Sequence, residues 1–179
     1  MLKADKAVLV VVDIQGKLAT LMHNREVFYQ NVIRMINGAR ALEIPILWNE
    51  QLPDKLGETI PEIKEVLRDK KPLIKKSFSC CGNPDFVDQL KQLKCKQVLL
   101  VGMETHICIY RTALDLLHDG YKVYLVTDAV ASRVPENKQL GIEVIKERGG
   151  LMTSVEMALF EIFDTAEGDK FKQMVQIVK

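Results

Sequence analysis

The chain has 179 residues, of which 47% are hydrophobic and 27% are charged. This length is typical of one α/β domain with a sizeable core, so we expect a single domain over residues 1–179. The 25 Lys and Arg residues nearly balance the 24 Asp and Glu residues, and the net charge of +1 gives no reason to expect nucleic acid or anionic lipid as a partner. The sequence shows neither a signal peptide nor an apolar run long enough to span a membrane. We therefore expect a cytoplasmic protein.

The cysteines point to the same compartment. Cys80, Cys81, Cys95 and Cys108 form no C-x-x-C pair and no metal-ligand spacing. Adjacent Cys80 and Cys81 are poorly placed to bridge each other, because disulfide geometry strains a neighbouring pair. The pattern favours reduced thiols in a cytosol over a disulfide-stapled secreted domain.

Short apolar runs alternate with amphipathic segments along the whole chain. The apolar runs predict strands at 6–12, 45–48, 72–74, 98–101, 121–126 and 151–152. Helical spacing predicts helices at 24–42, 60–67, from 83 or 85 to 93, between Gly102 and Gly120, 135–149, 155–163 and 171–178. Asn24 is the expected N-cap of the first helix, and Thr153 with Glu156 is the expected capping box of the helix at 155–163. The stretch 49–57 is expected to be a polar loop.

Strands that alternate with helices in this way predict a three-layer αβα fold with a six-stranded, mainly parallel sheet. Right-handed crossovers bring the C-terminal ends of the strands to one edge of the sheet. Asp13, a lysine at position 75 or 76, and Cys108 each lie at or after such an end. Alone, Asp13 could cap a turn and the lysine could be solvated. Their expected co-location makes the edge a candidate site.

Cys108 follows the buried strand 98–101 and the turn residue Gly102, which places it in the first turn of a helix. The free N–H groups and the positive dipole end of that turn favour an anion. Both effects lower a thiol pKa, so the position suits a reactive thiolate.

These segments carry a resemblance. The sequence resembles the isochorismatase-like cysteine hydrolase family, which includes nicotinamidases and N-carbamoylsarcosine amidase-type enzymes, over nearly its whole length. The resemblance is carried by Val-Val-Val-Asp13-Ile-Gln, Lys75-x-x-Phe78-Ser79 and Gly102-Met-Glu-Thr-His-Ile-Cys108-Ile. Asn49-Glu50-Gln51-x-Pro53-x-x-Leu56-Gly57 and Thr127-Asp128-Ala129-x-x-Ser132-Arg133 are most similar to its isochorismatase domain-containing branch.

The resemblance implies an isochorismatase-like, Rossmann-like fold and a catalytic triad of Asp13, Lys75 and Cys108. Lys75 is preferred to Lys76 because the family lysine lies four residues before the serine that corresponds to Ser79. The resemblance also implies a non-proline cis peptide between Met103 and Glu104. That bond would turn the Glu104 N–H toward the Cys108 N–H, so that the two amides form an oxyanion hole.

Where this sequence differs from members of the family, it limits which substrates and cofactors we expect. Nicotinamidases hold a metal ion through an Asp and two histidines after the second strand, and the three histidines of this chain lie elsewhere. We therefore expect neither a metal nor another cofactor, and nicotinamide is a poor substrate candidate. Isochorismatases proper lack the cysteine, which disfavours vinyl-ether cleavage. Candidate substrate-binding residues are Gln15, Trp48, Glu50, Gln51, Phe78 and His106, although Trp48 could equally belong to the core.

The resulting hypothesis is a hydrolase that cleaves a C–N bond in a small amide or carbamoyl compound through a thioester on Cys108. Two alternatives stay open: a catalytically silent scaffold or partner-binding member of the fold, and a redox-sensing thiol protein that uses Cys80 and Cys81. The expected partners are a small-molecule substrate and further copies of the chain in a homo-oligomer.

Overall fold

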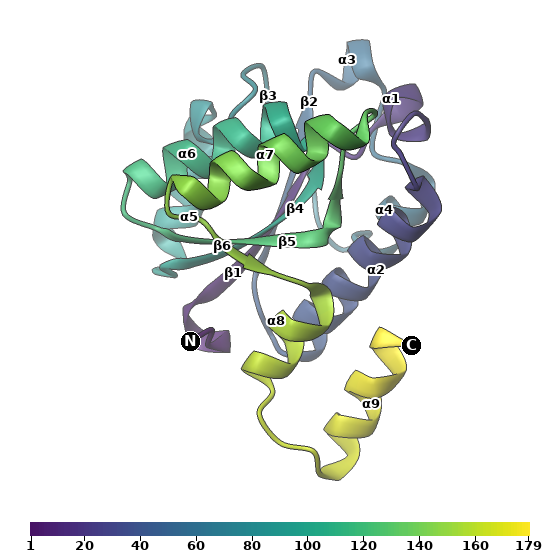
Figure 1. Ribbon diagram of the computed structural model, residues 1–179, viewed down its shortest axis with the longest axis vertical. Helices are drawn as coiled ribbons and strands as arrows, with labels where there is room; N and C mark the ends of the chain where they lie inside the picture. The colour runs from purple at the N-terminus through teal and green to yellow at the C-terminus, as the bar shows by residue number, and fades with distance from the viewer.

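The computed structural model describes residues 1–179 and contains one six-stranded sheet in the order β3-β2-β1-β4-β5-β6. Every neighbouring pair of strands is parallel, which confirms the predicted three-layer α/β fold (Figure 1). The strands are β1 (Ala7–Val12), β2 (Ile46–Gln51), β3 (Leu73–Lys75), β4 (Gln97–Met103), β5 (Lys122–Ala131) and β6 (Leu151–Thr153). The α-helices are α1 (Gly16–Thr20), α2 (Arg25–Ala41), α3 (Pro53–Leu56), α4 (Pro61–Val66), α5 (Pro84–Gln92), α6 (Tyr110–His118), α7 (Pro135–Glu147), α8 (Val155–Ile162) and α9 (Gly168–Val178). Three short turns complete the chain: η1 (Ala4–Lys6), η2 (Cys80–Gly82) and the π-helical turn η3 (Thr105–Ile109).

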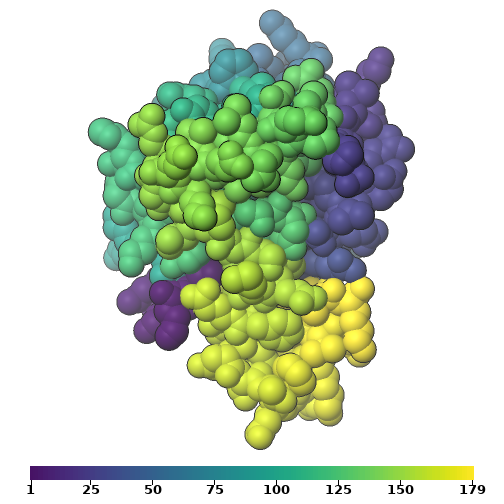
Figure 2. Space-filling view, viewed as in Figure 1, coloured from purple at the N-terminus to yellow at the C-terminus, as the bar shows by residue number.

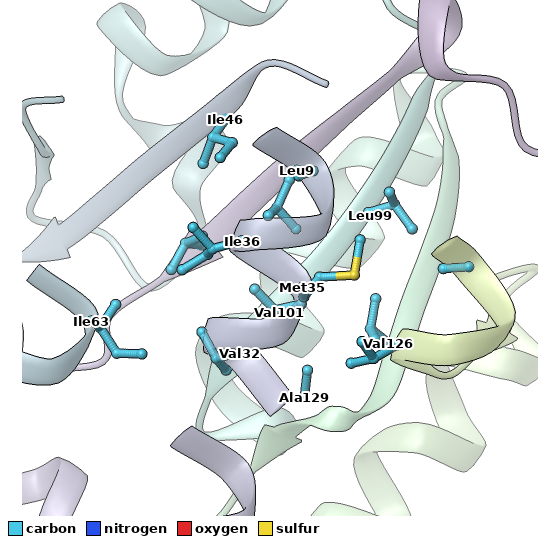
Figure 3. Packing of buried hydrophobic residues seen from close by; sticks show 14 of the residues in the cluster. Leu9, Val32, Met35, Ile36, Ile46, Ile63, Leu99, Val101, Val126 and Ala129 are labelled. Atoms are coloured by element: carbon cyan, nitrogen blue, oxygen red, sulfur yellow. The ribbon is translucent and has the colours of Figure 1, made fainter. Parts of the chain in front are cut away.

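The strands are buried on both faces, as their Val- and Leu-rich sequences predict. Leu9 of β1 and Leu99 of β4 share a core with Val32, Met35 and other residues of α2, to which α4 and α8 add (Figure 3). The opposite faces of the same strands pack on α5, α6 and α7 through the second apolar cluster. Because successive side chains of a strand alternate between faces, one apolar run supplies both cores.

Three strands extend well beyond the ends that the sequence predicts, and one of them, β4, continues through the expected turn residue Gly102 to Met103. The polar stretch expected to be a loop from residue 49 continues β2 to Gln51, and the short helix α3 follows it. β5 likewise runs past residue 126 to Ala131, with an irregularity in its pairing between Leu100 and Gly102 of β4. All three extensions carry backbone toward the sheet edge that the C-terminal strand ends form.

Helix capping also differs in detail. The hydroxyl of Ser154, rather than that of Thr153, accepts the Met157 N–H and caps α8. Asn24 holds the N-cap position of α2 with a left-handed backbone, but its side chain makes no capping hydrogen bond. The C-terminal helix α9 starts at Gly168 and lies beside α2, and Figure 2 shows its yellow surface against the indigo of that helix.

Candidate active site

Three strands end in residues with left-handed backbone at one edge of the sheet. These residues are Asp13 after β1 (φ 55°), Leu52 after β2 (φ 41°) and Glu104 after β4 (φ 57°). Non-glycine residues rarely adopt positive φ, at a cost of about 1–3 kcal/mol each, and such strain gathers at functional sites. Asp13 and Glu104 both line one pocket of about 220 Å³.

Asp13 forms a buried ion pair with Lys75. The Lys75 Nζ lies 2.6 Å from the Asp13 Oδ2, and the two side chains are 0% and 4% exposed. The same ammonium donates to the Gln51 Oε1 at 2.9 Å and to the carbonyls of Ser77 and Phe78 at 3.0 Å each. Burial raises the pKa of the Asp13 carboxyl group, and the charge of Lys75 opposes that shift.

Cys108 lies in η3, one residue before its end, and lines the pocket with Asp13. Its Sγ donates to the Gln51 Oε1 at 3.4 Å. Burial, and secondly the Asp13 carboxylate, raise the pKa of the thiol to about 12, and Lys75 only partly offsets them. Desolvation at this depth raises the thiol pKa more than Lys75 lowers it, which is opposite to the lowered pKa that the sequence predicts.

The pocket is lined by polar and apolar side chains in equal number. Besides Asp13, Gln51 and Cys108, its polar lining consists of Glu104 and Arg133. The apolar lining is formed by Leu18, Leu56, Phe78, Met103 and Ile107. A volume of about 220 Å³ suits a small molecule or one end of a larger one.

The family model for the Isochorismatase domain matches residues 7–157. The chain belongs to this family. It is 34% identical over 178 residues to the secreted isochorismatase effector Isc1 of Phytophthora sojae, which covers 97% of this chain and 84% of that protein. It is 33% identical to isochorismatase domain-containing protein 2 of Xenopus laevis, over 96% of this chain and 83% of the relative. Membership in the isochorismatase family supports a hydrolase-type function.

Solved structures agree with the assignment. The structure of MAR1 ribonuclease from Caenorhabditis elegans has a TM-score of 0.92 and 32% identity, covering 99% of this chain and 91% of that one. YcaC from Escherichia coli, described as an octameric hydrolase of unknown specificity, has a TM-score of 0.92 and 21% identity, covering 98% and 89%. The likeness to YcaC shows the isochorismatase-family fold alone.

Of the six predicted substrate-binding residues, Gln51 and Phe78 line the pocket. Trp48 and Glu50 do not line it: Trp48 Nε1 donates to the Thr59 hydroxyl at 2.9 Å and Glu50 Oε1 accepts the Thr59 N–H at 2.6 Å. Both therefore anchor the segment before α4, and neither contacts the pocket space.

Gln15 is fully buried, and it binds backbone. Its Nε2 donates to the carbonyls of Gln51 at 3.1 Å and Gly57 at 2.7 Å, and its Oε1 accepts the Gln51 N–H at 2.6 Å. The side chain thus fastens the end of β2, and it too lies outside the pocket lining of this isochorismatase-family chain.

His106 also lies outside the lining, in a network that includes a residue absent from the predicted set. Its Nδ1 is 3.1 Å from the Ser132 Oγ and 3.3 Å from the Glu104 Oε2. Arg133 donates through Nε to the Glu104 Oε1 at 2.6 Å and reaches the pocket. Arg133 follows the end of β5 by two residues, and the position of that strand end at the shared sheet edge is the signal that could have identified it.

The peptide bond between Met103 and Glu104 is trans, so the expected cis bond is wrong. The turn is made instead by Gly102 (φ 141°) and by the left-handed Glu104. The Glu104 N–H makes no hydrogen bond to a backbone carbonyl. The oxyanion-hole role of the Glu104 and Cys108 amides stays a prediction.

No three or more His, Cys, Asp and Glu side chains are grouped so that they could hold a metal ion. None of the helices combines the length and the apolar character that crossing a membrane requires.

Proposed function

We propose that this protein is a cysteine hydrolase that cleaves a C–N bond in a small amide or carbamoyl compound through a thioester on Cys108. One observation carries the proposal: the Cys108 thiol and the Asp13 carboxylate line the same 220 Å³ pocket, with the Lys75 ammonium 2.6 Å from that carboxylate. A nucleophile and a base in one small pocket, with a fixed cation in contact with the base, are the parts that covalent amide hydrolysis needs.

In the first half-reaction, Asp13 accepts the proton of the Cys108 thiol as sulfur attacks the substrate carbonyl carbon. A thiol with a pKa of about 12 loses its proton in step with the attack, so the base must be adjacent. Burial raises the pKa of the Asp13 carboxyl, which helps it hold that proton for a moment. The N–H groups of Glu104 and Cys108 stabilise the oxyanion, and Lys75 keeps Asp13 in place.

The tetrahedral intermediate then collapses. Protonated Asp13 gives its proton to the nitrogen, the C–N bond breaks, and the amine leaves a thioester on Cys108. In the second half-reaction Asp13 takes a proton from a water molecule that attacks the thioester carbon. The carboxylic acid leaves, and Asp13 returns the proton to the sulfur, which restores the resting thiol.

The test is a panel of small amides and ureas assayed with the wild type beside Cys108→Ala. We expect at least one substrate to be turned over by the wild type, and removal of the thiol to lower kcat by about 10³-fold or more. Circular dichroism checks that the variant is folded. Hydrolysis at the wild-type rate by Cys108→Ala would disprove the mechanism.

A scaffold without catalysis is the alternative. It predicts no turnover across the panel and no covalent adduct on Cys108. RNA cleavage, which the C. elegans protein carries in its name, finds less support here, because the pocket is small and the net charge of +1 gives no reason to expect nucleic acid as a partner. Ribonuclease activity that persists in Cys108→Ala would favour it.

We also infer a reducing compartment such as the cytoplasm. All four cysteines are free, and Cys80, Cys95 and Cys108 are buried. The P. sojae relative is named as a secreted protein, so the compartment of this protein needs a direct test. Fractionation of the cells that produce it would show whether it is found in the cytoplasm or outside the cell.

A further inference from the structure

Gln51 occupies the point where the ion pair meets the thiol. Its Oε1 accepts a hydrogen bond from the Lys75 Nζ at 2.9 Å and another from the Cys108 Sγ at 3.4 Å. Because an ammonium group only donates, the atom beside it must be the carboxamide oxygen, and this fixes the orientation of the side chain. One oxygen therefore joins the two partners that the chemistry must keep together.

The backbone of Gln51 is held as firmly as its side chain. Fully buried Gln15 accepts the Gln51 N–H at 2.6 Å and donates to the Gln51 carbonyl at 3.1 Å. The next residue, Leu52, has the strained φ of 41° and donates its N–H to the Lys75 carbonyl at 3.1 Å. The end of β2 therefore has little freedom to move the carboxamide away from the sulfur.

We propose that Gln51 is a positioning residue for the nucleophile: its carboxamide oxygen holds the Cys108 thiol protonated and in place beside Asp13, with Lys75 as the anchor of that oxygen. This assignment rests on the proposed function and extends it. A hydrogen bond to the neutral form of a group favours that form. The partial negative charge of the oxygen also opposes a thiolate at the same distance, so the nucleophile is released only as Asp13 takes its proton.

Substitutions at position 51 should change the reactivity of the Cys108 thiol in a predictable order. Gln51→Leu removes the acceptor and leaves Lys75 less neutralised, so the thiolate becomes easier to form. Gln51→Glu keeps an acceptor but adds a negative charge next to sulfur, so the thiolate becomes harder to form. A change of one pKa unit alters the thiolate fraction about tenfold below the pKa.

The experiment measures alkylation of Cys108 by iodoacetamide between pH 7 and pH 10, read by peptide mass spectrometry at residue 108. We expect Gln51→Leu to react about 3–10-fold faster than the wild type, and Gln51→Glu to react about tenfold slower. Exposed Gln173 of α9 provides the matched controls, because Gln173→Leu and Gln173→Glu make the same chemical changes far from the pocket. Both controls should react at the wild-type rate.

The proposal would be overturned if the alkylation rates of the wild type, Gln51→Leu and Gln51→Glu agreed within a factor of two. The reverse order of rates would overturn it as well. If Gln51→Glu does not fold, Gln51→Leu against the wild type decides alone. The assay needs no substrate, so its outcome is separable from that of the proposed function. Turnover retained by Cys108→Ala would remove the thioester mechanism and leave the alkylation order standing, whereas equal alkylation with Cys108-dependent turnover would remove only the role of Gln51.

Discussion

The ion pair between Lys75 and Asp13 is expensive to bury. Lys75 is among the largest fully buried side chains, and Asp13 is 3% exposed. A buried ion pair seldom adds net stability, because desolvation of both charges offsets their attraction. Loss of either partner would leave an uncompensated buried charge. The pair is therefore better explained by a role in catalysis than by a contribution to stability. This agrees with the proposed role of Asp13 as the base.

The raised thiol pKa predicts a pH dependence of stability. The ordinary pKa is 9.0, and in the fold the pKa of Cys108 is about 12. Between these values the unfolded chain loses a proton that the folded chain retains, so the free energy of unfolding falls as pH rises above about 9. By pH 10 this thiol alone should cost about 1.4 kcal/mol.

Urea unfolding of the wild type and of Cys108→Ala at pH 7.5, 9 and 10 measures the effect. The variant lacks the titrating thiol, so its stability relative to the wild type should improve as pH rises. Cys108→Ser is the matched control and should follow the alanine variant. A stability difference that stays constant from pH 7.5 to pH 10 would contradict the raised pKa.

At the level of elements, apolar periodicity located the strands but not their ends. The extra residues of β2 and the first two extra residues of β5 are polar, and some of their side chains find partners only in the folded chain. Asn49 Nδ2 donates to the Val11 carbonyl at 3.3 Å, and the Thr127 hydroxyl donates to the Thr153 carbonyl at 3.1 Å. A local sequence pattern carries no information on hydrogen bonds to residues that are distant in sequence. These segments are therefore predicted as loops, although they are strands in the folded protein.

At the level of elements, Gly102 is a position beside the site where a larger residue would not fit. Its φ is 141°, and a Cβ there would lie 2.2 Å from the Val12 carbonyl oxygen on the neighbouring strand. Gly102→Ala must therefore separate β1 from β4 at the edge that carries Asp13 and Glu104. We expect a loss of about 3 kcal/mol or more in thermal or urea unfolding.

Gly120 provides the comparison. It also has positive φ, at 80°, but nothing lies within 4 Å of the position of its Cβ. Gly120→Ala should cost only the left-handed backbone energy of about 1–2 kcal/mol. Equal losses for the two variants would show that the contact with Val12 does not matter.

At the scale of the whole molecule, we predict that the protein forms a homo-oligomer. Large apolar side chains stay exposed in the single chain, among them Ile74 at 48%, Phe78 at 57% and Leu151 at 43%. Ile74 and Leu151 belong to β3 and β6, the two edge strands of the sheet. Exposed apolar groups on edge strands are commonly covered by a partner.

Sedimentation velocity at several protein concentrations checks this prediction. We expect a species of twice the monomer mass or more, and Phe78→Ser should shift it toward the monomer if the copies meet beside the pocket. A single monomeric species at every protein concentration, including the highest at which the protein stays in solution, would contradict the prediction.

The sequence by itself determined the family, the α/β layers and the strand-end positions of Asp13, Lys75 and Cys108. It could do so because apolar runs report burial locally and parallel crossovers send strand ends to one edge. Only the tertiary structure decided that burial raises the pKa of the thiol and that Gln51 bridges Lys75 and Cys108. It also decided that Gln15, Trp48, Glu50 and His106 lie outside the pocket lining. These properties depend on burial and on charges from segments far apart in the chain, and no local pattern encodes them.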